Sequence, residues 1–150
     1  MSIHAPSVFL REHWRKLLPG WSDPVQSVLL YLQPSPVQLS DRTSETEVVK
    51  DSLRADFLQL AEQWSGLILR AGFLAEPFDP KHGTPLYSAP GEWPLDDVAV
   101  AHALLHYPIT EEGGCKILHH PNWRTGIFPS TLLSSAPPNV LKDLVMKIRL

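Results

Sequence analysis

Residues 51–72, DSLRADFLQLAEQWSGLILRAG, form the stretch that decides the fold. Apolar side chains recur there at spacings of three and four residues, at Leu53, Phe57, Leu60, Trp64, Leu67, Ile68 and Ala71. This spacing predicts one long helix with a single apolar side. Asp51 is a candidate N-cap, Ser44 with Glu47 is an earlier one, and Gly72 is the expected terminating glycine. Such a helix needs a sheet or other helices to cover it, so we predict a two-layer domain.

The residues before this helix predict a helix and a strand. Ser7 is the candidate cap of the first helix, which Pro19-Gly20 ends. Val25–Leu32 is apolar and free of breakers, which favours a buried strand. Residues 34–46 contain two prolines and little periodicity, so we predict a loop and the most mobile part of the chain.

The residues after it form a long loop and then an ambiguous segment. Residues 77–94 hold five prolines and predict a structured loop, with Leu86–Tyr87 as a candidate short strand. In Leu95–Tyr107, a cap at Asp96 favours a helix, whereas the alternation of apolar side chains favours a strand. We favour the helix.

A hairpin is predicted next. Cys115–His120 is the first strand, residues 122–126 (NWRTG) are the turn, and Ile127–Leu133 is the return strand. Pro129 implies an edge position or a bulge, because proline cannot donate to the ladder. Pro137-Pro138 then opens a last helix with Ser135 as its cap. The predicted fold class is α+β, with a small, mostly antiparallel sheet packed by helices in a single domain over residues 1–150.

Composition narrows the function classes. Thirteen basic against sixteen acidic residues give a net charge of −3, which disfavours nucleic acid as a partner. Apolar runs are only a few residues long, so no membrane span is expected. The single cysteine excludes an internal disulfide and suits a reducing compartment. Phosphate-binding loops, nucleophile elbows, HExxH and CxxC motifs are absent. These absences disfavour a nucleotide-driven reaction without excluding an enzyme. We assign no catalytic residues and no metal site.

Cys115 is the most distinctive residue in the sequence. Gly113 and Gly114 precede it and leave space around the thiol, and Lys116 follows as a cation that would favour the thiolate. A soft cofactor metal or a nucleophilic role would suit such a cysteine, and a small buried apolar residue is the simpler interpretation. Strand alternation places His119 on the same face as Cys115.

Two other features remain open on sequence alone. Trp123 with Arg124 at the turn suits a partner-binding anchor, or the pair caps the edge of the core. Residues 79–83 (DPKHG) have the composition of a turn in which Asp79 bonds its own following backbone. His102 and His106 have a spacing that zinc ligands use on a helix, but two histidines alone favour a simpler interpretation, with one half-buried near Tyr107 and the other in solvent.

The order of landmarks resembles a known family. The run GGCKILHHPNWRTGIFPSTLLSSAPP (residues 113–138) is preceded by AGFLAEPFDPKHGTPLY (residues 71–87) and FLREHWRKLLPGW (residues 9–21). In this order they resemble the methylmalonic aciduria and homocystinuria type D protein family. The resemblance extends from about Phe9 to Ile148.

The resemblance implies a fold and a function. The fold would be a degenerate nitroreductase-like domain that has lost flavin binding. The function would be that of a non-enzymatic adaptor in the cytoplasm, which docks on the type C cobalamin-processing protein. It would help route cobalamin toward methionine synthase or methylmalonyl-CoA mutase, sharing the cofactor with its partner. Cobalamin contacts would involve Gly113, Gly114, Cys115, Lys116 and His119.

One position departs from the family pattern. Animal members carry two adjacent cysteines before the lysine, and the first is the proposed cobalt ligand, whereas this sequence has Gly114 there and Cys115 second. Either a glycine-rich bulge lets Cys115 swing round to cobalt, or cobalamin is held through partner contacts without a thiolate.

Two enzyme functions are the alternatives. A flavin-dependent nitroreductase-like oxidoreductase would need a basic phosphate cluster, for which only Arg11, Arg15 and Lys16 are available. A zinc hydrolase would need Cys115, His119 and one histidine of the His102–His106 pair.

Overall fold

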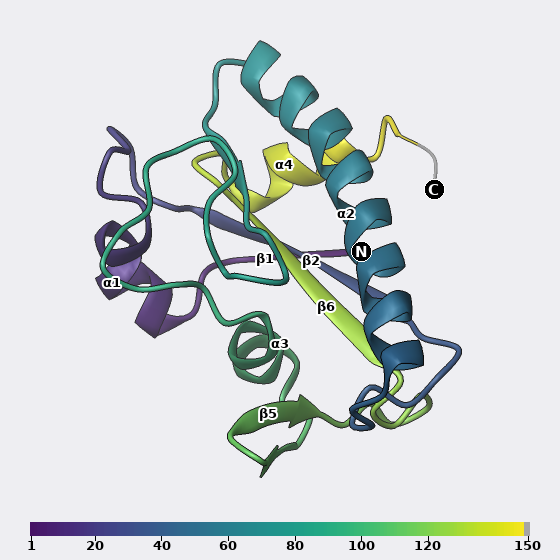
Figure 1. Ribbon diagram of the computed structural model, residues 1–150. Coiled ribbons are helices and arrows are strands. Elements are labelled where there is room, and N and C mark those ends of the chain that lie inside the picture. The colour runs from purple at the N-terminus through teal and green to yellow at the C-terminus, as the bar shows by residue number, and fades with distance from the viewer. Residues whose placement is uncertain (149–150) are drawn as a thin grey trace.

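The computed structural model describes residues 1–148 and is built around a four-stranded antiparallel sheet (Figure 1). The spatial order is β1-β2-β6-β3. Their bounds are β1 Ser2–His4, β2 Ser27–Pro34, β3 Ala75–Pro77 and β6 Ile127–Ser134. Strands β2 and β6 pair along their whole length, from Ser27 opposite Ser134 to Pro34 opposite Ile127. This long pair is the centre of the fold.

Helices cover both faces of this sheet, so the domain has three layers and the predicted two-layer arrangement is wrong. The helices are α1 Val8–Leu17, α2 Ser44–Arg70, α3 Asp97–Leu105 and α4 Pro138–Val145. Helices α1 and α3 pack on the face that carries Val28 and Leu133. Helices α2 and α4 pack on the face that carries Leu29 and Leu132 (Figure 1). The α+β class and the small antiparallel sheet are confirmed.

The long helix has the predicted buried side and an earlier start. Phe57, Trp64 and Ile68 are fully buried, as the apolar spacing requires, whereas Ala71 is exposed. The N-cap is Thr43, whose hydroxyl oxygen accepts from the backbone N–H of Thr46, so the prediction of Asp51 as the cap is wrong. The apolar spacing marks only the buried part of a helix, so it does not show that the helix begins earlier, in the polar residues from Ser44 onward.

Gly72 ends α2 as predicted. Its φ of +90° is left-handed, and its N–H donates to Leu69 O at 3.0 Å. The N–H of Phe73 donates to Ile68 O at 3.2 Å. These two bonds form a Schellman motif, which satisfies carbonyl groups that the helix end would otherwise leave open.

The predicted pairing of Cys115–His120 with Ile127–Leu133 is wrong. Strand β5, Cys115–Leu118, pairs with β4, Ile109–Glu112, in a separate two-stranded sheet. Strand β4 was not predicted, because its sequence ITEE carries only one apolar residue. Sequence proximity favoured a hairpin with β6, whereas β6 is needed between β2 and β3 to complete the core.

Most of the remaining elements follow the predictions. Helix α3 begins after an Asp96 cap, and β2 lies two residues later than expected. The prediction of a strand at Leu86–Tyr87 is wrong, because these residues form a bend. Helix α4 starts at Pro138 with Pro137, not Ser135, in the N-cap position. The nitroreductase likeness and the mobility of residues 34–46 stay predictions. No helix within residues 1–148 combines the length and apolarity needed to cross a bilayer.

Because the central strands are buried, we expect truncation of a leucine on β6 to cost more stability than truncation of an exposed leucine on α2. Leu132→Ala on β6 should lower the free energy of unfolding by about 2–5 kcal/mol, because Leu132 has no exposed surface and the truncation leaves a cavity. Leu69→Ala on α2 removes the same atoms from a side chain that is 50% exposed and should cost less than about 1 kcal/mol. Urea denaturation measures both values, and equal losses would contradict this packing.

Candidate functional site

A two-glycine turn connects β4 to β5. Gly113 and Gly114 have φ values of +56° and +80°, and the strands meet with Glu112 opposite Cys115. Positive φ at both central residues is what the favoured two-residue hairpin turns require, and glycine adopts it without a steric penalty. The glycines were expected to clear space around the thiol. In the structure they close the hairpin.

Arg42 ties the tip of this hairpin to the loop before α2. One guanidinium nitrogen donates to the carbonyl oxygens of Glu112 and Gly113, each at 3.0 Å. A Cβ atom on Gly113 would lie 2.9 Å from the Arg42 guanidinium. The hairpin tip is therefore held by the loop before α2. Glycine at position 113 leaves room for the Arg42 guanidinium.

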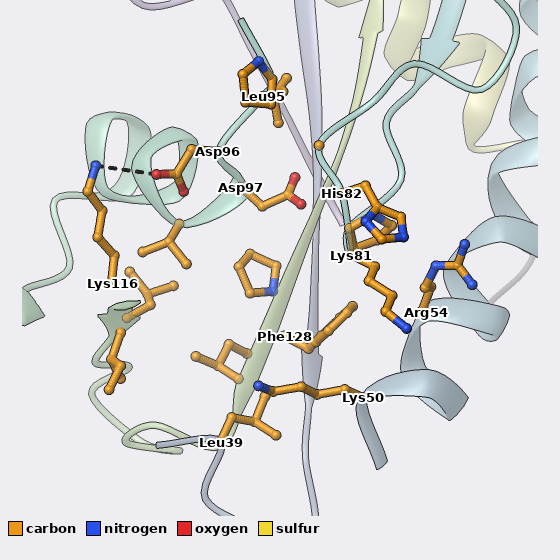
Figure 2. Close-up of a pocket in the computed structure, with 18 of the residues that line it drawn as sticks. Leu39, Lys50, Arg54, Lys81, His82, Leu95, Asp96, Asp97, Lys116 and Phe128 are labelled. Atoms are coloured by element: carbon orange, nitrogen blue, oxygen red, sulfur yellow. Dashed lines mark hydrogen bonds and ion pairs between the residues drawn. The ribbon is translucent and has the colours of Figure 1, made fainter. Parts of the chain in front are cut away.

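Cys115 is the first residue of β5 and its side chain is exposed. Leu118 is buried in the core, so alternation directs Lys116 toward the protein and Cys115 away from it. The Lys116 ammonium lies 3.3 Å from the Asp96 carboxylate, so this cation forms an ion pair with α3 (Figure 2). The interpretation of Cys115 as a small buried apolar residue is wrong.

His119 lies close to β4 and far from the thiol. Its Nε2 is 2.8 Å from the Thr110 hydroxyl oxygen. At about 3.3 Å per residue, four strand positions separate it from Cys115 by roughly 13 Å. One side chain or a single small ion cannot connect groups at that distance.

The zinc hydrolase alternative has no support in the described part of the chain. No three His, Cys, Asp or Glu side chains within residues 1–148 are placed to hold a metal ion. His102 Nδ1 lies 2.6 Å from the Tyr107 carbonyl oxygen. His106 is the C-cap of α3 with φ of +61°, so it leaves the helical face it was expected to share. Both histidines are exposed, so the prediction that one of them is half-buried near Tyr107 is wrong, although His102 does contact the Tyr107 carbonyl group.

The turn after β5 presents an aromatic side chain. Two backbone hydrogen bonds, of 2.7 and 2.9 Å, join His120 and Arg124 and close the turn. The Trp123 ring stacks on His120 with centroids 4.3 Å apart and remains 42% exposed. The Tyr107 ring meets the His120 edge, and burial lowers the pKa of His120. Trp123 and the exposed Arg124 thus form a supported surface, as a partner-binding anchor requires.

Behind the hairpin lies a cleft of about 500 Å³ between α2 and α3 (Figure 2). Its walls come from α2, the loop 80–83, the start of α3, β5 and the first residues of β6. Lys50 and Arg54 lie on the α2 side, and Lys81 and His82 lie above them. Lys116 belongs to both the hairpin and the cleft. The strand predicted to contact cobalamin therefore forms one wall of this cleft.

Asp97 lies in this cleft and was missed by the sequence analysis. Its side chain is 8% exposed, and Oδ1 has no hydrogen-bond partner. Burial is the main cause that raises the pKa of Asp97 to about 8; the Thr131 hydroxyl acts against it, and the nearby charges of Asp96 and Asp79 add to it. The signal in the sequence was the Asp96-Asp97 pair at a helix start, where only the first acid is needed as a cap.

An ion pair fixes the opposite wall. Arg54 Nε and Nη2 donate to the two Asp79 oxygens at 2.7 and 2.6 Å. The pKa of Asp79 is lowered, first by this hydrogen bonding. Asp79 Oδ1 also accepts from the Lys81 N–H at 2.9 Å, which confirms the predicted turn. Gly83 has φ of +69°, and a Cβ there would meet the Leu95 carbonyl oxygen. The turn predicted for residues 79–83 thus forms part of one wall of the cleft.

Comparison with known proteins decides the family. Residues 1–149 match the family described as "Methylmalonic aciduria and homocystinuria type D protein". The chain belongs to this family. A curated relative is the human "Cobalamin trafficking protein CblD", which is 20% identical over 137 residues. That alignment covers 90% of this chain and 46% of the relative, so the chain spans about half the length of the relative it matches.

Position 114, where the resemblance led us to expect a first cysteine, lies in the hairpin turn with a left-handed backbone. Gly114 has φ of +80°, which side chains with a Cβ rarely adopt, although open space surrounds it. A cysteine at 114 would therefore strain the turn. Cys115 lies in the extended strand and needs no such conformation.

The cations expected for a flavin enzyme have other neighbours. Lys16 Nζ lies 3.0 Å from the Glu92 carboxylate, and the Arg15 guanidinium lies 4.5 Å from the Trp14 ring centroid. Both groups therefore already have partners in α1 and in the loop 90–94. The geometry does not favour a phosphate site there.

Asp97→Asn should flatten the pH dependence of stability. The folded protein keeps the Asp97 proton up to about pH 8, whereas the unfolded chain loses it near the ordinary value of about 4. The unfolding free energy of the natural chain therefore falls as pH rises through this window, and Asn removes that contribution. Urea denaturation at pH 5 and pH 8 measures the slope. Asp143→Asn on exposed α4 should keep the natural slope, and an unchanged slope for Asp97→Asn would contradict the burial argument.

Proposed function

We propose that this chain is a non-enzymatic adaptor in cobalamin trafficking. It docks on a type C cobalamin-processing protein and helps pass the cofactor toward methionine synthase or methylmalonyl-CoA mutase. Family membership and the name of the human relative support the cobalamin role. The observation that carries the proposal is the segment 115–126, which presents a free thiol and a supported tryptophan.

The exposed thiol suits a cobalt contact. Thiolate sulfur is a soft ligand and binds soft or borderline transition metals well. Cys115 is the single cysteine of the chain and faces solvent, so no internal disulfide can consume it. Cobalamin held by the partner would meet Cys115 at the start of β5, with Gly113, Gly114 and Lys116 around it. His119 would lie just beyond the other end of β5, next to Thr110.

The adjacent turn suits protein docking. Trp123 offers a large side chain whose position is set by stacking on His120, so little side-chain entropy is lost on binding. Arg124 lies beside it with φ of +52°, exposed. An aromatic residue next to an arginine is a frequent centre of binding energy at interfaces.

A mixture of three components tests the adaptor. The chain, a type C partner and reduced cobalamin should elute as one complex in gel filtration, and the absorption spectrum of cobalamin should change only when both proteins are present. Separate elution of the two proteins would remove the proposal. Turnover of a substrate by the chain alone would replace it with an enzyme function.

Cys115→Ser should abolish the spectral change and leave complex formation intact. The hydroxyl is nearly the size of the thiol, but it is a poor ligand for cobalt, and the side chain is exposed, so folding is unaffected. The absorption spectrum and gel filtration of the same sample measure both effects. If the variant still produces the spectral change that the natural chain produces, cobalamin is held without the thiolate.

Trp123→Ala should weaken partner binding at least tenfold, in line with the usual contribution of a central interface tryptophan. Trp93→Ala is the matched control, because Trp93 is 39% exposed and packs on Phe9 and His13 of α1 instead. Titration calorimetry with the partner gives both affinities. Equal losses for the two variants would place the interface elsewhere.

A further inference from the structure

We propose that the cleft between α2 and α3 binds a primary carboxamide, held by the side-chain carboxyl of Asp97 and the backbone carbonyl of Pro129. Nothing in the adaptor function requires this cleft. The inference rests on a buried side chain without a partner, on the direction of one backbone carbonyl and on the charges around the cleft.

Asp97 is not needed as the cap of α3, and the one polar side chain of β6 that acts on its carboxyl, Thr131, forms no hydrogen bond of normal geometry with it. Asp96 already caps α3, because its Oδ1 accepts from the Ala99 N–H at 3.1 Å, and its Oδ2 pairs with Lys116. Asp97 Oδ1 is buried without a partner, although burying an unpaired polar group costs stability. Figure 2 shows the Asp97 side chain between the start of α3 and the loop that carries Lys81 and His82. A ligand group in the cleft would supply the missing partner.

Pro129 supplies an acceptor at the floor of the same cleft. Strand β3 ends at Pro77, and the N–H of Phe78 donates to Thr131 O at 3.0 Å. Residues two apart in a strand direct their carbonyls to the same side, so the Pro129 carbonyl also points away from β2. Past Phe78, the side of β6 that faces away from β2 has no neighbouring strand and borders the cleft, which Pro129 lines. Because proline has no N–H, the position offers an acceptor only.

The walls give the cleft the character of a small-molecule site. Leu95, Val98 and Phe128 provide apolar surface, and the volume of about 500 Å³ lies within the usual range for ligand pockets. Two polar groups among apolar walls fix the orientation of a ligand and contribute specificity.

The charges select a neutral group. Three of the cations that line the cleft are already paired: Lys116 with Asp96, Arg54 with Asp79 and Lys50 with Glu47. A charged ligand therefore finds little free counter-charge, and the Pro129 acceptor and Asp51 disfavour a carboxylate or phosphate. Below its pKa of about 8, Asp97 is neutral, so it can donate to a carbonyl oxygen and accept from an N–H. A carboxamide carries that oxygen and two N–H groups, and the second N–H can reach Pro129.

Two kinds of molecule carry a primary carboxamide that would fit this cleft. One is a free small amide. The other is a side chain of the corrin ring, which bears primary carboxamides. This second source rests on the proposed function, because it needs cobalamin to be presented at β5, the strand that contributes Lys116 and Leu118 to the cleft.

Benzamide and benzoate are the probes, because they share a ring and differ only in the polar group. Titrated into the full chain and followed by backbone amide shifts, benzamide should saturate with shifts confined to the cleft, at Gly83, Asp97 and Ile127. Benzoate should bind at least tenfold more weakly. Equal or tighter binding of benzoate, or no saturable shift with benzamide, would overturn the proposal, and both results need only the natural protein.

Variants at position 97 then test the contact. Asp97→Leu should weaken benzamide binding about tenfold, because the hydrogen bonds are lost while the volume is kept. Asp97→Asn keeps one donor and one acceptor and should bind within about threefold of the natural chain. Asp143→Asn on α4 is the unchanged control. Benzamide binding that is equal in the natural chain and in folded Asp97→Leu would overturn the assignment.

The complex with the partner and cobalamin distinguishes the two sources. If the corrin supplies the amide, Asp97→Leu should also weaken assembly of that complex about tenfold. If only benzamide binding is affected, the ligand is a free amide. If no complex forms with the natural chain, the adaptor proposal fails, whereas the benzamide result still decides the cleft.

Discussion

The complete burial of β6 is the constraint on which the rest of the structure depends. All eight of its residues are buried, because α1 and α3 cover one face and α2 and α4 the other. A strand buried on both faces must also satisfy its backbone, which it does by pairing with β2 along its length and with β3 over its last three residues. The helices, the loop 77–94 and the second sheet are arranged around this strand.

The short length of β3 gives the molecule its cleft. Because β3 ends at Pro77, the first part of β6 has a strand neighbour on one side only, and the loop 79–83 turns away, held by Arg54. Pro129 lies in this part of β6, where the missing N–H costs no ladder bond. The predicted edge position of Pro129 is therefore right locally, although β6 as a whole is an interior strand.

The functional features divide between a protruding hairpin and the cleft behind it. The hairpin carries the exposed cysteine and leads into the tryptophan turn, so it suits contacts with a large partner. The cleft contains a buried carboxyl and suits a small neutral group. Lys116 joins the two, because it lies in β5 and pairs with Asp96 at the start of α3. A ligand bound at the hairpin and a ligand bound in the cleft would therefore both contact β5.

Local sequence determined the helices, because each stop, cap or apolar stripe acts within a few residues: Ser7 caps α1, Gly72 ends α2 and Asp96 caps α3. It also determined the Asp79 turn, whereas it left open whether Trp123 is exposed or covers the edge of the core. Tertiary structure alone decided which strands pair, since β6 lies next to β2 rather than β5. It likewise decided the burial of Asp97 and its place in one cleft with Arg54 and Pro129. These properties arise between segments far apart in the chain, where no short-range pattern acts.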